Sequence, residues 1–172
     1  MKKFITLNKY GELYIDKILF ETYFPIIFTC KNENNDIFIC VCCQCNENGC
    51  KWLVGRTNGS FIVRMLQNEI TIRQLLLDCC TEKISVDYKN QEYAIAYNNS
   101  DWNEESDYLP KKDAYIDAEG GEFDEEIAYF TSIEHVEYNE EYYKIIIKEL
   151  STIGNTIDPL LDSITALSSI IG

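Results

Sequence analysis

Apolar and polar residues alternate through much of the first hundred residues, which is the pattern expected of half-buried β-strands. Six stretches alternate in this way or are apolar throughout: residues 13–20, 26–30, 37–43, 51–55, 83–88 and 92–97. Short polar segments lie between many of these stretches and are typical of turns. The sequence therefore predicts an antiparallel meander of about five strands between residues 13 and 97.

Helical signals interrupt this pattern between residues 58 and 77. The apolar run at residues 61–66 follows Asn58 and Gly59 and suits a short helix. Thr71 precedes a second apolar run and is followed three positions later by Gln74, which is the spacing of a capping box. Two short helices are therefore predicted to lie between the strands.

The chain after residue 97 changes character. Residues 98–121 contain many turn formers, which predicts an irregular segment lying over the sheet. Phe123, Ile127 and Phe130 then recur at helical spacing.

Two further helices are predicted near the C-terminus. Asn139 can cap a helix over residues 140–150, and Asp158 followed by Pro159 begins an amphipathic helix with an apolar stripe through residues 160–171. The predicted fold class is therefore α+β: an antiparallel β-sheet meander with short helices, followed by an acidic segment and C-terminal helices.

Charge is distributed unevenly along the 172 residues. Residues 1–97 hold 11 basic and 11 acidic side chains, whereas residues 98–172 hold 4 basic and 18 acidic ones and account for the whole net charge of −14. This predicts a charge-neutral sheet scaffold at residues 1–97. An acidic segment with amphipathic helices at residues 98–172 is expected to pack with it as one unit. Such an acidic chain is not expected to bind nucleic acid or an anionic membrane directly, because both need a basic surface.

The acidic residues between positions 101 and 126 are the candidate partner-binding site. On a helix, acids three and four residues apart lie on one face, so these side chains could form a row of negative charge resembling a phosphate backbone. The candidate residues are Asp101, Glu104, Glu105, Asp107, Asp117, Glu119, Glu122, Asp124, Glu125 and Glu126.

Such a surface would suit a basic protein partner that itself binds nucleic acid. Small acidic cytosolic proteins with this property include immunity proteins and phage anti-defence inhibitors, among them anti-CRISPR proteins that mimic DNA. The plainer interpretation is a solvated face that confers solubility. One alternative function is a structural or assembly subunit that forms a homodimer through residues 159–171.

Eight cysteines support a further alternative, a small enzyme or zinc-binding domain that uses the cluster between Cys40 and Cys50. Cys40 and Cys43 form one C-x-x-C motif, and Cys42 and Cys45 form another. These motifs lie in a strand-like run, where residues three apart point to opposite faces and cannot bind the same metal ion. The sequence therefore predicts reduced cysteines packed in the core, with no metal and no disulfide among these four.

Catalytic and targeting motifs are not found in the sequence. There is one histidine, His135, and there is no phosphate-binding glycine loop or nucleophile motif, so no catalytic residue and no cofactor are predicted. No apolar stretch of a secretory signal follows Lys2 and Lys3, and no run is long enough to span a bilayer. We expect a cytoplasmic protein that does not bind membranes.

Four segments of the sequence, at residues 24–28, 31–38, 52–54 and 70–75, carry a resemblance to known proteins. Across about residues 13–115 the chain resembles a family of small uncharacterised bacterial and phage proteins. The resemblance implies a similar fold, and it implies no activity or catalytic residue. The acidic segment and the cysteine cluster depart from the pattern of that family.

Overall fold

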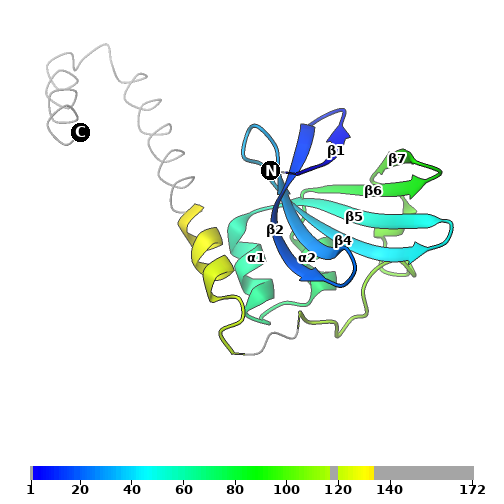
Figure 1. Ribbon diagram of the computed structural model, residues 1–172. Coiled ribbons are helices and arrows are strands. Elements are labelled where there is room, and N and C mark those ends of the chain that lie inside the picture. The colour runs from blue at the N-terminus through cyan, green and yellow to red at the C-terminus, as the bar shows by residue number, and fades with distance from the viewer. Residues whose placement is uncertain (1, 117–119, 134–172) are drawn as a thin grey trace, which may run out of the picture. The chain divides into compact units, whose positions relative to one another are not determined.

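The chain forms a seven-stranded antiparallel sheet in which each strand pairs with its neighbours in the sequence (Figure 1). This computed structural model describes residues 2–116 and 120–133, so the helices predicted at residues 140–150 and 159–171, and also His135, lie outside the described residues. The strands are β1 (Lys3–Leu7), β2 (Gly11–Glu21), β3 (Pro25–Lys31), β4 (Ile37–Asn46), β5 (Gly49–Thr57), β6 (Glu82–Lys89) and β7 (Glu92–Tyr97).

The predicted antiparallel meander with short helices is confirmed, but the number of strands is larger than expected. All six predicted stretches are strands, and β1 is an additional one. β1 has only five residues, too few for a clear alternating pattern, and it pairs with β2 through an irregular register. Its place in the sheet depends on contacts with β2 and with the core.

Both faces of the sheet are buried, each in a separate apolar core. One core gathers side chains from β1 through β6, among them Leu13, Phe28 and Phe38. On this face the Phe4 ring lies 5.6 Å from the Trp52 ring, although β1 and β5 are four strands apart in the sheet. In a flat sheet these strands would be about 19 Å apart, because neighbouring strands are about 4.8 Å apart. The sheet therefore curls, and we call this concave side the inner face.

Two short helices cover the outer face. In α1 (Gly59–Leu66) the N-cap side chain of Asn58 accepts a hydrogen bond from the backbone N–H of Phe61. In α2 (Ile72–Asp78) the predicted capping box of Thr71 and Gln74 is present with both of its hydrogen bonds. The buried sides of the two helices pack on the sheet residues of the outer core, which include Ile39 and Leu53.

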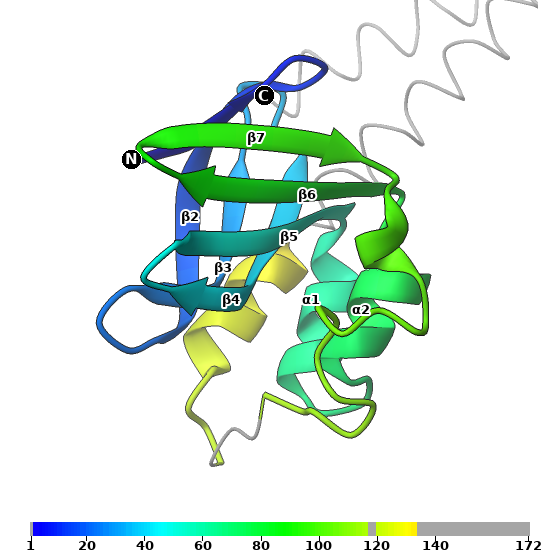
Figure 2. The same ribbon diagram turned by 90° about the vertical axis from the view of Figure 1, so that its right-hand side faces the viewer.

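Residues 98–116 and 120–133 complete the outer core. They contribute four buried apolar side chains, Trp102, Leu109, Phe123 and Phe130. In both views residues 98–116 lie on the α2 side of the helix pair, and the helical segment at residues 124–133 lies on the α1 side (Figures 1 and 2). The change in charge at residue 98 therefore does not coincide with a break in packing. Across the described ranges, no helix has the length and apolar character needed to cross a membrane.

The contact between α1 and the segment at residues 124–133 generates a stability prediction. Glycine at the start of a helix is ordinarily replaced by alanine with a gain in stability of about 0.4–1 kcal/mol. A Cβ atom at Gly59 would lie 2.7 Å from the carbonyl oxygen of Phe130. We expect Gly59→Ala to lower the free energy of unfolding by about 1–3 kcal/mol, measured by urea denaturation.

Gly120→Ala is the matched control, because a Cβ atom there has no neighbour within 4 Å. It should change stability by less than about 0.5 kcal/mol. A gain in stability from Gly59→Ala would show that residues 124–133 do not pack against α1.

Candidate functional site

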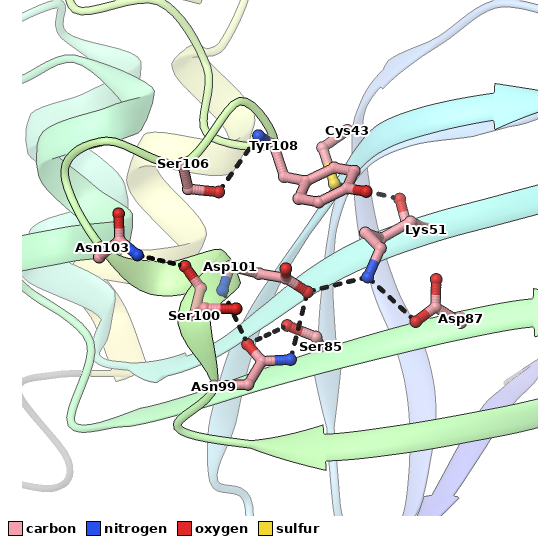
Figure 3. A network of polar contacts seen from close by, with 10 residues as sticks. All are labelled: Cys43, Lys51, Ser85, Asp87, Asn99, Ser100, Asp101, Asn103, Ser106 and Tyr108. Carbon is pink, nitrogen blue, oxygen red and sulfur yellow. Dashed lines mark hydrogen bonds and ion pairs between the residues drawn. The ribbon is translucent and has the colours of Figure 1, made fainter.

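A buried ion pair fastens the beginning of the acidic segment to the sheet (Figure 3). Lys51 lies on β5, and Asp87 lies directly opposite it on β6. The Nζ atom of Lys51 lies 3.0 Å from Asp87 Oδ2 and 2.8 Å from Asp101 Oδ2. Asp101 belongs to the short 3-10 helix η1 (Ser100–Trp102), and only 12% of its side chain is exposed. The ammonium group therefore joins two strands to the segment that follows β7.

Neighbouring polar groups hold Asp101 in place. Asn99 donates from Nδ2 to Asp101 Oδ2, and its Oδ1 accepts hydrogen bonds from Ser85 Oγ and from the backbone N–H of Asp101. Tyr108 adds a cation–π contact, with its ring centre 4.7 Å from Lys51 Nζ. Residues 99–108 are thus fixed to β5 and β6 by several contacts at once (Figure 3).

The ion pair shifts the pKa values of both partners. Burial is the largest single influence and alone would raise the pKa of the Asp101 carboxyl, but the hydrogen bond and charge of Lys51, together with hydrogen bonds from Ser85 and Asn99, outweigh it and hold this pKa below its ordinary value. Burial alone would lower the pKa of Lys51, but hydrogen bonds to Asp101 and Asp87 raise this pKa above its ordinary value. Both groups are therefore charged at neutral pH.

The acids that follow Asp101 are placed differently from it. Glu104, Glu105 and Asp107 are exposed. Their backbone is nevertheless held in place, because the Arg73 guanidinium on α2 donates to the carbonyl oxygens of Glu104 and Pro110. These carboxylates project from a fixed loop.

A second group of acids lies around the start of the helical segment at residues 124–133. Glu122, Asp124 and Glu125 are exposed and Glu126 is half-buried, whereas Asp117 and Glu119 lie outside the described residues. Carboxylates in the first turn of a helix are also favoured by the helix dipole.

Tyr129 anchors this helical segment to the sheet. Its hydroxyl donates to Asp16 Oδ1 at 2.7 Å and accepts from Lys31 Nζ at 2.9 Å. Burial, together with the hydrogen bond to Asp16, raises the pKa of Tyr129 well above its ordinary value, so the phenol keeps its proton.

The ten candidate residues therefore do not form one row. Asp101 is buried and ion-paired, so it does not belong to an exposed acidic face. The acids at 104–107 lie in the segment on the α2 side, and those at 122–126 lie at the helical segment on the α1 side (Figure 2). Two acidic surfaces thus flank the helix pair: the α2-side surface (Glu104, Glu105 and Asp107) and the α1-side surface (Glu122, Asp124, Glu125 and Glu126).

The ion pairs of the sheet scaffold are formed mostly with acids of the same part of the chain. Six basic side chains in residues 2–97 form ion pairs, and all but one of their partners lie within the same range: Lys3–Glu12, Lys9–Glu82, Lys31–Asp16, Lys51–Asp87, Lys51–Asp101, Arg56–Asp36 and Arg64–Glu69. Within the part of the chain that the structure describes, no ion pair involves Glu104, Glu105 or Asp107. The same holds for Asp124 and Glu125.

A hollow of about 250 Å³ adjoins the α2-side surface. It lies between α2 and the segment at residues 98–116, and the carboxylates of Asp78 and Glu104 line it together with Arg73 and Lys112. The hollow is of a size to accept a side chain of a binding partner.

The residues that hold the acids in place were missed by sequence reasoning. Lys51 had a detectable signal, since it is a single cation beside the apolar run of β5 and would need a buried partner. Arg73 and Tyr129 had none, because their partners are remote in the sequence.

The prediction that the cysteines are reduced core residues is partly wrong. Cys30, Cys40 and Cys80 are buried free thiols, as expected. Cys45 and Cys50, however, face each other across the β4–β5 hairpin and form a disulfide. β4 continues to Asn46, but its side chains are exposed from Gln44 onward, so Cys45 lies outside the core opposite its cross-strand neighbour Cys50.

The two C-x-x-C motifs are not arranged as a metal site. Cys40 packs in the inner core and Cys43 in the outer core, as expected for residues three apart in a strand. Among the residues with described positions, no group of three or more His, Cys, Asp or Glu side chains could hold a metal ion.

Comparison of the chain with protein-family models, curated proteins and solved structures gave no match. The resemblance to small bacterial and phage proteins stays a prediction.

The Lys51–Asp101 pair generates a pH-dependent prediction. Asp101→Asn should lower the free energy of unfolding at pH 7 by about 1–3 kcal/mol, because the buried Lys51 ammonium loses one of its two carboxylate partners. The folded-state pKa of Asp101 is depressed, so the stability that it provides is present above the unfolded pKa of about 3.9 and is lost as the pH falls below that value. Urea denaturation should therefore show a difference between wild type and variant that shrinks from pH 7 to pH 3.

Glu69→Gln serves as the control, because it removes the exposed Arg64–Glu69 pair. This change should cost less than about 1 kcal/mol. Equal effects of the two variants at pH 7 would contradict the structural role assigned to Asp101.

Proposed function

We propose that this protein binds a basic protein partner through its acidic surfaces and blocks the nucleic-acid site of that partner. The observation that carries the proposal is that exposed carboxylates stand on a fixed backbone, and that six cations of the scaffold form their ion pairs with other acids. Arg73 holds the backbone beneath the α2-side surface, and Tyr129 holds the helical segment of the α1-side surface. A surface fixed before binding loses little conformational entropy when a partner docks.

The chemistry of the partner follows from the charge. Exposed carboxylates attract a basic surface, speed its encounter and penalise acidic competitors. A groove that binds nucleic acid is such a surface, since it carries Lys and Arg for phosphates. The two acidic surfaces lie on either side of the helix pair and could contact two parts of one groove. Action of the immunity-protein or anti-defence type in the cytoplasm is part of this proposal.

The alternative of a cysteine-dependent enzyme receives no support from the thiols. Burial raises the pKa of Cys43 to about 12 and that of Cys80 to about 12. A nucleophilic cysteine needs the opposite shift, because the thiolate is the reactive form. The alternative of dimerisation through a helix at residues 159–171 stays a prediction.

The proposal predicts that binding depends on charge and salt. The partner would be isolated on the immobilised protein from a lysate of the source cells at about 50 mM salt, purified and tested by surface plasmon resonance. Raising the salt to about 500 mM shortens the Debye length from above about 10 Å to below about 5 Å and should slow association at least tenfold. Glu104→Gln/Glu105→Gln/Asp107→Asn and Asp124→Asn/Glu125→Gln should each slow association, and nucleic acid should compete with the protein for the partner.

The matched control removes three exposed acids from the neutral part of the surface, as Glu21→Gln/Glu33→Gln/Glu47→Gln. It changes the net charge by the same amount as the triple variant and should leave the association rate nearly unchanged. The proposal is wrong if the isolated partner is not basic, if nucleic acid does not compete, or if the control slows association as much as the site variants do.

A further inference from the structure

Among the described strands, β7 is the last of the sheet and has one edge that pairs with no other strand. β7 pairs with β6 on one side, and no described strand pairs with it on the other. Figures 1 and 2 show it at the margin of the sheet. Natural proteins usually protect such an edge with lysines, a proline, a bulge or a covering loop. β7 contains no lysine or proline, its pairing with β6 has no register shift, and its one charged residue is Glu92 at its start.

The β6–β7 turn determines which backbone groups of β7 point outward. Its two central residues, Asn90 and Gln91, have φ angles of 51° and 67°, as in a type I′ hairpin turn. Such a turn closes with a hydrogen bond between its flanking residues, here Lys89 and Glu92. Hydrogen-bonded and non-hydrogen-bonded pairs then alternate along the ladder.

This alternation gives Ala94 and Ala96 their hydrogen bonds to β6. The hydrogen bond from the Asn98 N–H to the Lys83 carbonyl, at 2.7 Å, continues this alternation, because Asn98 follows Ala96 by two residues. The backbone N–H and C=O groups of Tyr93, Ile95 and Tyr97 therefore point away from β6, toward the unpaired edge.

The side chains of these three residues are also exposed in part. They lie on the inner face, because they stand opposite Tyr88, Val86 and Ile84 of β6. Tyr93 is 47% exposed and Tyr97 is 37% exposed. A hollow of about 170 Å³, lined by aromatic side chains that include Phe4, Trp52 and Tyr93, lies at this side of the curled sheet. The edge thus offers hydrogen bonds and an aromatic surface together.

The sequence of the strand is a palindrome about Ile95: Tyr93, Ala94, Ile95, Ala96, Tyr97. We propose that β7 pairs antiparallel with β7 of a second copy of this chain, around a two-fold axis at Ile95. Each Tyr93 then lies opposite Tyr97 of the other copy, and Ile95 lies opposite its own counterpart. The backbone groups of Ile95, at the centre of the palindrome, point outward, as do those of Tyr93 and Tyr97. Each Tyr93–Tyr97 pair and the Ile95–Ile95 pair between the two copies can therefore exchange two backbone hydrogen bonds.

The charges along β7 are compatible with pairing to a second copy. In this register Glu92 lies opposite Asn98 of the second copy, so acid does not meet acid although the chain carries a net charge of −14. Symmetry places each Tyr97 beside Tyr93 and the aromatic hollow of the other copy, and aromatic cross-strand pairs stabilise sheets. The inference does not depend on the proposed function, because it uses neither acidic surface.

Sedimentation velocity tests the proposal. The full chain should change from its monomer mass of 20.0 kDa to twice that mass as its concentration rises. Tyr93→Lys/Tyr97→Lys places like charges opposite each other and should leave the protein monomeric at every concentration. Tyr93→Lys/Tyr97→Glu places opposite charges across the same two-fold axis and should restore the dimer.

Tyr23→Lys/Tyr115→Lys is the matched control, since it replaces two exposed tyrosines away from β7 and should dimerise as wild type does. Amide hydrogen exchange by NMR gives a second readout that needs no variant. Tyr93, Ile95 and Tyr97 amides should become protected as the dimer forms, whereas Ala94 and Ala96 amides should be protected in both states. A wild type that is monomeric at millimolar concentration overturns the proposal. So does a dimer whose Tyr93, Ile95 and Tyr97 amides still exchange fast, or one that the double lysine variant does not weaken.

Discussion

The sheet must bury both of its faces, and most other features of the molecule follow from this requirement. The inner face is buried when the sheet curls, which brings Phe4 of β1 against Phe28 and Trp52. A curled sheet cannot cover its own convex side, so the outer face needs further elements. The two helices cover part of it, and residues 98–133 supply Trp102, Leu109, Phe123 and Phe130 for the rest. The acidic segment is therefore a structural layer as well as a charged one.

Because the acidic segment both covers the core and carries the charge, its packing determines where the negative charge lies. The buried side chains that residues 98–116 and 120–133 add to the outer core are apolar, and most of the described acids between them face solvent. Among the described acids of this layer, Asp101 is buried, and it is compensated by Lys51. The basic side chains of residues 2–97 that form ion pairs do so mostly with acids of the same range. The net negative charge therefore stays on the outer layer. Packing thus converts a composition bias in the sequence into two fixed acidic surfaces, each held by a polar anchor from the scaffold.

The sequence predicts the local parts of this structure better than the long-range ones. Alternating strands, the capping box of Thr71 and the helical spacing around Ile127 are encoded within a few residues, and the structure contains each of them. The pairing of Lys51 with Asp101 spans 50 residues, and that of Tyr129 with Asp16 spans 113. Such contacts are set by the fold as a whole. For that reason the candidate acids were found as a group, while the burial of Asp101 and the separation of the rest into two surfaces were not.

The two edges of the sheet are unequal. β1 is short and irregular and carries Lys3, so it is a poor template for another strand. β7 is regular and nearly uncharged, and on its other side it has no strand partner within the described chain. A net charge of −14 keeps copies of the protein apart over most of their surface. Two copies can approach each other most easily where their surface carries little charge, as along β7. The symmetric sequence of β7 provides there a surface that is complementary to its own copy.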